Sequence, residues 1–130
     1  MLQKSPGGSV FPYYYKGGEV HCLKYGSFFK DTDALFNIMK SEESFIIGKN
    51  RKLNVWVDFY ETSLTNEVLM EFVKSLHRLD NYIGKLSIVG FSAIDRWRFR
   101  NTIKKLQIDM YTPIKFYSDP EDAKTWLVQD

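Results

Sequence analysis

Hydrophobic and polar residues follow two periods along the chain, one typical of strands and one typical of helices. Short runs rich in β-branched and aromatic residues, bounded by turn residues, predict four strands. These runs are 19–26, 53–59, 85–90 and 113–117. The run 53–59, LNVWVDF, is nearly all apolar, as expected of a central strand in a parallel sheet.

Between the predicted strands, apolar residues recur at the three- and four-residue spacing of amphipathic helices. Ser92, with Asp95 three residues later, predicts a capping box, and Ser118 or Asp119 before Pro120 predicts the N-cap of the last helix. The four predicted helices cover residues 31–44, 65–82, 92–106 and 118–128.

The first 18 residues lie outside this alternation. They carry two Gly-Gly pairs around FPYYY, which predicts a short aromatic strand, paired antiparallel at an edge of the sheet, and a turn. Residues 19–130 are then expected to form an α/β domain. Its sheet is predicted to be mixed and mainly parallel, with four or five strands covered by about four helices.

Composition narrows the class of protein. A length of 130 residues, 44% of them hydrophobic and 26% charged, is typical of one globular domain. No apolar run approaches the roughly 20 residues that span a bilayer, and the first ten residues lack the apolar stretch of a secretory signal. We therefore expect a cytoplasmic protein without a transmembrane segment. A single cysteine, Cys22, and two distant histidines, His21 and His77, favour neither a disulfide nor a metal site, and no cofactor is expected.

Three stretches, in this order, resemble a known family: VWVDF at 55–59, LSIVG at 86–90 and IKFYSDPEDAKTWL at 114–127. With a Trp-bearing helix at Trp97 between the last two, they resemble the STAS domain superfamily. Within it they are most similar to the small SpoIIAA-like proteins, which are also compared with the CRAL-TRIO lipid-binding fold. The resemblance covers residues 19–128 and implies a regulatory domain that works through protein contacts.

The resemblance also directs attention to the loop after the VWVDF strand. In STAS antagonists that act as phosphorylation switches, this loop carries an Asp-Ser-Ser/Thr-Gly motif whose serine accepts the phosphate. The corresponding loop here, YETSLTNEV at 60–68, lacks the Asp-Ser pair and the glycine. The resemblance therefore implies a partner-binding loop containing Glu61, Ser63 and Thr65, with Ser63 and Thr65 as candidate phosphoacceptors, but without the switch motif.

Candidate catalytic groups have simpler structural interpretations. Asp58 ends a central strand with Glu61 three residues on, which could make a pair of carboxylates, but an Asp at this point more often binds the backbone of its own loop. Ser92 is expected to cap a helix rather than act as a nucleophile. Because no glycine-rich phosphate loop or converging catalytic set is present, we do not expect an enzyme.

The stretch 95–105, DRWRFRNTIKK, holds five of the eighteen Lys and Arg residues. Wound as a helix, it aligns Arg96, Arg100 and Lys104 on one ridge, with Trp97 at the border. An apolar stripe toward the sheet is expected from Ile94, Phe99, Ile103 and Leu106. With a net charge of only +2, the ridge would neutralise about three phosphates, so no nucleic acid partner is expected. Two interpretations of this ridge remain. It is a solvated helix face, or it is part of a site, formed by Ser92, Arg96 and Arg100, that binds an acidic protein.

Aromatic residues offer two further candidate surfaces. Phe11 and the tyrosines at 13–15 either pack over the edge of the sheet or form an exposed interface patch. A second aromatic set either belongs to the ordinary core or lines a cavity for an apolar ligand. This set is Phe28, Phe29, Phe36, Phe45 and Trp56.

The sequence thus favours a non-catalytic, STAS-like regulatory or protein-interaction module that binds a protein partner or a second copy of itself. The alternative is a small binding protein for an apolar, lipid-like ligand, of the CRAL-TRIO-like type.

Overall fold

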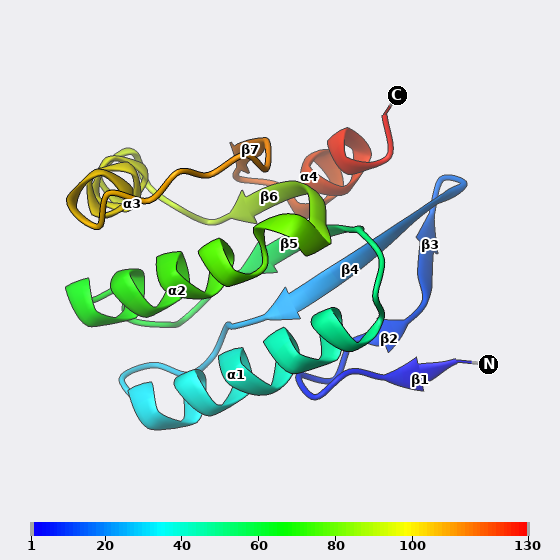
Figure 1. The fold of residues 1–130 in the computed structure, drawn as a ribbon, viewed down its shortest axis with the longest axis horizontal. Coiled ribbons are helices and arrows are strands. Elements are labelled where there is room, and N and C mark those ends of the chain that lie inside the picture. The colour runs from blue at the N-terminus through cyan, green and yellow to red at the C-terminus, as the bar shows by residue number, and fades with distance from the viewer. Residues whose placement is uncertain (1, 130) are drawn as a thin grey trace.

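A mixed five-stranded sheet forms the centre of the computed structural model, which describes residues 2–129 (Figure 1). Its strands, in spatial order, are β3 (Tyr13–Tyr15), β4 (Gly18–Lys24), β5 (Leu53–Asp58), β6 (Ile83–Val89) and β7 (Ile114–Tyr117). β3 pairs antiparallel with β4, and the other neighbours pair in parallel. The predicted mixed, mainly parallel sheet and its antiparallel aromatic edge strand are both confirmed.

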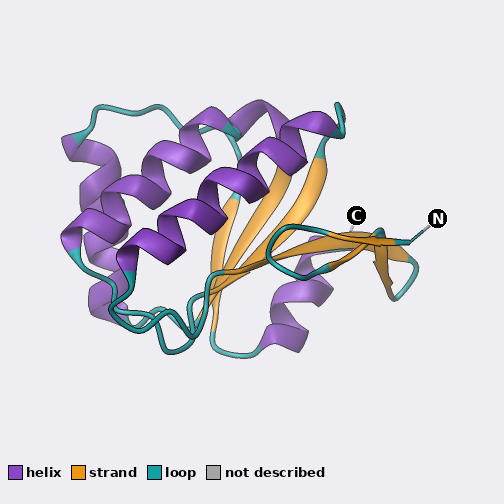
Figure 2. Cartoon of the chain, turned by 90° about the horizontal axis from the view of Figure 1, so that it is seen from below, coloured by secondary structure: helices purple, strands orange, loops and turns teal. Residues whose placement is uncertain are grey.

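The helices are distributed unequally over the two faces of the sheet. Those within residues 2–129 are α1 (Thr32–Gly48), α2 (Asn66–Arg78), α3 (Ala93–Lys105) and α4 (Pro120–Leu127), with a short 3-10 helix, η1 (Asp80–Tyr82). Successive parallel strands add on the same side of the sheet, so right-handed crossovers place α1, α2 and α3 on one face. Figure 2 shows these three helices on that face and α4 on the other. None of the helices in this range has the length and apolarity needed to cross a bilayer.

The main core lies between the sheet and α1, α2 and α3. Along β5, burial alternates strictly: Leu53, Val55 and Val57 are buried, whereas the residues between them are only half-buried. α2 contributes the largest apolar face, centred on Phe72, whose ring packs against those of Tyr25, Phe59 and Phe99. The helix-covered face therefore provides most of the hydrophobic stabilisation.

The N-terminal segment forms a hairpin that the sequence did not predict. β1 (Gln3–Lys4) and β2 (Val10–Phe11) pair antiparallel beside α1. The fully buried Glu42 of α1 holds the hairpin: its carboxylate accepts hydrogen bonds from the Ser5 hydroxyl at 2.7 Å and the Gly7 amide at 3.1 Å, and lies 3.2 Å from His21 Nε2. Phe11 is buried beside it, so the interpretation of Phe11 as an exposed residue is wrong.

The prediction that Ile94 of α3 faces the sheet is also wrong. Phe99 is buried, and Ile103 and Leu106 pack partly against the core, but Ile94 is exposed. Residues five apart differ by about 140° around a helix, so Ile94 cannot share the face of Phe99. Ile94 instead projects from the first turn of α3.

Candidate functional site

The carboxyl ends of the parallel strands β4, β5 and β6 meet at one edge of the sheet, here called the carboxyl edge (Figure 1). The two loops after β4 and β5 are bound to each other there. The Phe29 amide donates to the Glu61 carbonyl at 2.8 Å, and the Ser63 amide donates to the Phe29 carbonyl at 2.7 Å. The Thr62 hydroxyl donates to the Tyr25 carbonyl at 2.6 Å. These bonds fix the two loops as one surface.

The predicted loop residues lie together on this surface. Thr65 is exposed and caps α2, its hydroxyl accepting from the Val68 amide at 3.2 Å. Ser63 is half-buried, while Glu61 is exposed and accepts from the Ser27 hydroxyl at 3.3 Å. Of the two candidate phosphoacceptors, Thr65 therefore presents the more accessible side chain, although its hydroxyl oxygen already serves the helix.

Two predicted structural roles are confirmed at the same edge. The Ser92 hydroxyl accepts from the Asp95 amide at 3.1 Å, and the Asp95 carboxylate accepts from the Ser92 amide at 3.3 Å, which is the predicted capping box. Asp58 Oδ1 accepts from the Tyr60 amide at 2.9 Å, so this carboxylate binds the backbone of its own loop.

The start of α3 adjoins the loop surface through an arginine that sequence reasoning had not selected. Arg98 donates to Asn66 Oδ1 at 2.9 Å and thereby ties α3 to the start of α2. Arg100 is exposed, with its guanidinium 5.1 Å from the ring of Phe116, and Arg96 is half-exposed. The predicted partner residues of α3 and of the loop therefore belong to one edge of the molecule.

Four large apolar side chains are exposed at the carboxyl edge, and we call them the carboxyl-edge patch. Phe29 is 60% exposed, Tyr60 65%, Ile94 71% and Trp97 66%. Phe29 and Tyr60 lie in the loops after β4 and β5, and Ile94 and Trp97 lie in the first two turns of α3. The sequence placed Tyr60 in the predicted partner-binding loop but assigned Phe29 to the core or to an apolar cavity. The exposure of Phe29 could have been inferred from its position in the loop after β4, where a large apolar side chain has no sheet to cover.

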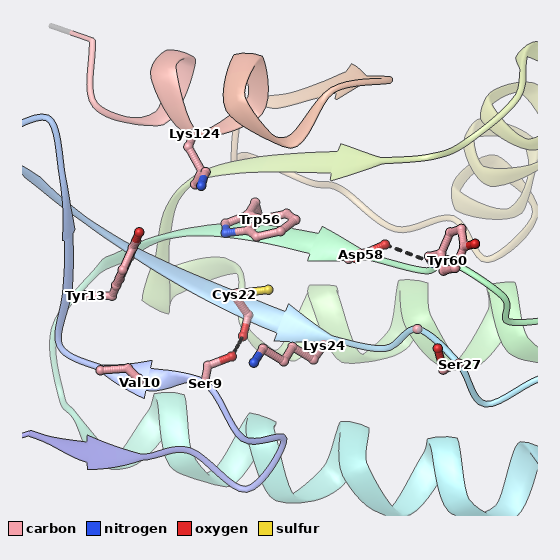
Figure 3. Close-up of a pocket in the computed structure, with 11 residues that line it drawn as sticks. Ser9, Val10, Tyr13, Cys22, Lys24, Ser27, Trp56, Asp58, Tyr60 and Lys124 are labelled. Carbon is pink, nitrogen blue, oxygen red and sulfur yellow. Dashed lines mark hydrogen bonds between the residues drawn. The ribbon is translucent and has the colours of Figure 1, made fainter.

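The other face of the sheet contains a pocket of about 420 Å³ (Figure 3). α4 packs on β5, β6 and β7, and the pocket opens beside it over β4 and β5. Cys22 and Trp56, which are register neighbours on β4 and β5, form its floor. Its walls come from β3, the N-terminal hairpin, α4 and the two loops of the carboxyl edge. The lining of these walls includes Ser9, Tyr13, Lys24, Asp58, Tyr60 and Lys124.

Charges are arranged unevenly around the pocket. The Lys124 ammonium is 5.9 Å from the centre of the Trp56 ring and 4.8 Å from that of Tyr15, and it pairs with Glu121 at 3.2 Å. The Lys24 ammonium donates to the Gly8 carbonyl at 3.3 Å. The pocket walls therefore hold two ammonium groups against one carboxylate, that of Asp58.

Burial makes the thiol of Cys22, on the floor of the pocket, unreactive. Loss of hydration raises the pKa of the Cys22 thiol to about 12, with nearby Lys24 and Asp58 acting in opposite directions. The side chain is then a neutral thiol near pH 7 and a weak nucleophile. His21, its neighbour in sequence, points to the opposite face, where it meets Glu42.

The aromatic set proposed to line an apolar cavity is divided by the structure. Phe28, Phe36 and Phe45 pack against the main core, Phe29 is exposed at the carboxyl edge, and Trp56 lies on the opposite face of the sheet. Phe99 is buried, which leaves Trp97 as the exposed aromatic ring of the cationic stretch.

Comparison of the chain with protein-family models, curated proteins and solved structures gives no match. Fold and surface define an α/β protein with three helices on one face of its sheet, a pocket on the other and an apolar patch at the carboxyl edge. Membership of the STAS superfamily stays a prediction from the sequence.

Proposed function

We propose that this chain is a non-catalytic, STAS-like regulatory module that binds another protein through its carboxyl edge. The observation that supports this function best is the carboxyl-edge patch, because four large apolar side chains exposed at one edge are typical of an interface. Phe29 and Tyr60 lie on loops that hydrogen bonds hold in place, and Ile94 and Trp97 lie on helix α3, so binding needs little ordering of the surface.

Charge points to an acidic partner. α3, which contributes Ile94 and Trp97 to the patch, carries five Lys and Arg residues against the single acid Asp95. A complementary acidic surface would speed association and fix its orientation, while apolar residues on the partner would cover Trp97. The partner is another protein or a second copy of this chain.

A binding role, rather than catalysis, agrees with the roles of the polar side chains. Asp58 binds its loop, Ser92 caps α3, and Cys22 is held as a neutral thiol. Asp58 and Ser92, two of the candidate catalytic groups from the sequence, therefore already have structural roles, and the Cys22 thiol is held in an unreactive form.

The experiment that tests this function is charge reversal on α3. Arg96→Glu combined with Arg100→Glu should abolish capture of the partner that the wild-type chain retains in stoichiometric amount. Lys40→Glu combined with Lys52→Glu is the matched control, because it changes the net charge equally at exposed positions of α1 and of the turn before β5. Equal capture by both double variants would contradict the proposal. A dimer in native mass spectrometry that only the α3 variant disrupts would identify a second copy as the partner.

Phosphorylation of Ser63 or Thr65 is proposed only from the position of their loop. Phosphate at Thr65 would lie at the N-terminus of α2, where negative charge is favourable. Intact-mass measurement of protein from its own host, with Ser63→Ala and Thr65→Ala as site controls, tests this. An unchanged mass in every growth condition would contradict it.

A small-ligand carrier is the second candidate function, and the pocket beside α4 is the observation that favours it. Gently purified protein should then show an added mass in native mass spectrometry that denaturation removes. A bare protein mass would leave partner binding as the better proposal.

A further inference from the structure

The pocket on the α4 side of the sheet has the size and shape of a site for a small molecule. Its volume of about 420 Å³ lies within the ~300–1,000 Å³ of typical ligand sites. Its floor is made by adjacent strands of the sheet, and the hairpin wall is fixed by a 2.6 Å hydrogen bond from the Ser9 hydroxyl to the Cys22 carbonyl. The site is therefore built on rigid elements rather than on a loose loop.

The floor selects for a planar apolar group. Trp56 is half-buried beside α4, and Figure 3 shows its ring lying over β5 between Lys124 and Cys22, with Tyr13 on the neighbouring wall. Aromatic rings prefer offset-stacked or edge-to-face contacts with other rings. A flat ring laid on Trp56 would also contact the apolar thiol of Cys22.

The walls select for a negative charge. Figure 3 shows Lys124 reaching from α4 toward the Trp56 ring, and Lys24 on the far side of Cys22, with its ammonium group beside Ser9 of the hairpin. Lys24 makes one hydrogen bond, to a backbone carbonyl, and an ammonium group has three donors. Lys124 pairs with Glu121, which does not line the pocket. Both ammonium groups therefore have N–H donors left for an anionic ligand.

Cys22 and Asp58 also line the pocket. Cys22 is a neutral thiol, because burial raises its pKa to about 12. Asp58 lies farther along the pocket toward the carboxyl edge, where its carboxylate is bound to the Tyr60 amide at 2.9 Å (Figure 3). The lining therefore holds two ammonium groups against one carboxylate, which favours an anionic ligand.

We propose that this pocket binds a small aromatic carboxylate, with the ring on the floor of Trp56 and Cys22 and the carboxylate attracted by the ammonium groups of Lys24 and Lys124 on opposite walls. The site shares Tyr60 with the carboxyl-edge patch, but Trp56, Lys24 and Lys124 lie outside that patch, so its test is independent of charge reversal on α3. The lining of the pocket therefore favours a ligand with a planar apolar ring and one negative charge.

The test is an NMR titration with three probes that share one ring system: 1-naphthoate, 1-naphthamide and 1-naphthylmethylamine. The chain has three Trp residues, whose indole N–H signals are separate reporters in 15N-labelled protein. 1-Naphthoate should shift the Trp56 signal saturably, at least about tenfold more tightly than the neutral amide, and the amine should bind weakest. The signals of Trp97 and Trp126 should stay in place.

Two substitutions locate the charge recognition. Lys24→Met and Lys124→Met should each weaken binding of 1-naphthoate about fivefold and leave binding of the amide unchanged. Lys115→Met is the matched control, because the Lys115 ammonium also lies over a Trp ring, 5.3 Å from the centre of Trp126, but outside the pocket. It should leave binding of 1-naphthoate unchanged.

Four results of these experiments would overturn the proposed ligand site. No saturable shift of the Trp56 signal at millimolar 1-naphthoate would overturn the proposal, as would equal affinity for the acid, the amide and the amine. A shift confined to Trp97 or Trp126, or an equal loss in Lys115→Met, would also overturn it. Dispersed amide spectra of the variants verify that each one is folded.

Discussion

On one face of the sheet, α1, α2 and α3 cover the strands with apolar side chains; on the other, α4 covers only part and leaves a pocket with two lysines. Both faces come from the same strands. In β5, Val55 and Val57 point into the main core, while Trp56 between them forms the pocket floor. The covered face should therefore set stability, and the open face should be free to change its chemistry at little cost in stability.

The largest effect should come from the centre of the covered face. Phe72→Ala removes a fully buried ring from a cluster with Tyr25, Phe59 and Phe99, and should lower the free energy of unfolding by about 4 kcal/mol. Denaturant unfolding measures this change. Met70→Ala, an exposed site on the same helix, should cost less than about 1 kcal/mol; equal costs would remove the distinction between the two sites.

The second effect concerns the buried carboxylate under the N-terminal hairpin. Glu42→Ala leaves the Ser5 hydroxyl and Gly7 amide without their acceptor and should lower the free energy of unfolding by about 2–3 kcal/mol. Amide hydrogen exchange should also accelerate in residues 3–11. Glu43→Ala, which breaks an ion pair with the largely exposed Arg78, should cost less than about 1 kcal/mol and leave hairpin exchange unchanged. Unchanged hairpin exchange in Glu42→Ala would contradict this role.

A third, smaller effect depends on pH. Asp80 accepts from the Thr112 hydroxyl at 2.7 Å and the Thr112 amide at 3.0 Å. Burial acts to raise the pKa of Asp80, but these hydrogen bonds and one from the Tyr111 amide outweigh it and lower the pKa. The stabilisation is therefore complete above the unfolded pKa and is lost as pH falls through the lower folded pKa.

Asp80→Asn should accordingly cost about 1 kcal/mol near pH 7 and progressively less below about pH 4. Unfolding curves of both proteins across this range measure the difference. A cost that stayed constant with pH would show that ionisation of Asp80 contributes nothing.

The smallest effect should come from the open face. Lys24→Met and Lys124→Met should each change the free energy of unfolding by less than about 0.5 kcal/mol, since methionine keeps most of the aliphatic side chain and the polar partners, the Gly8 carbonyl and Glu121, stay accessible to water. Denaturant unfolding of the two lysine variants measures this change. A loss comparable to that of Phe72→Ala would mean that the open face also holds the fold together.

Local patterns allowed the sheet, the covering helices and several caps to be predicted from the sequence. The apolar strand β5, the Ser92 capping box and the Asp119 N-cap each depend on residues a few positions apart. The hairpin was missed because its strands have two residues each, and its anchor, Glu42, is 35 residues from Gly7.

The candidate sites also differ in how far the sequence predicts them. Loop residues at the carboxyl edge could be located from strand order alone, because parallel strands end at a common edge. The pocket could not, since it joins Tyr13, Cys22, Trp56 and Lys124 from four separate elements. Its existence depends on how far α4 extends over the sheet, which no local pattern encodes.

The central claim, partner binding through the carboxyl edge, is tested most directly by photocrosslinking in the host cell. A benzophenone amino acid replaces Trp97 in one protein and Tyr111 in another; both side chains are exposed, but Tyr111 follows α3 at the opposite edge of the sheet. The account predicts one discrete adduct from position 97, lost when Arg96→Glu and Arg100→Glu are added, and none from position 111. No adduct at position 97, or the same adduct from both positions, would contradict it.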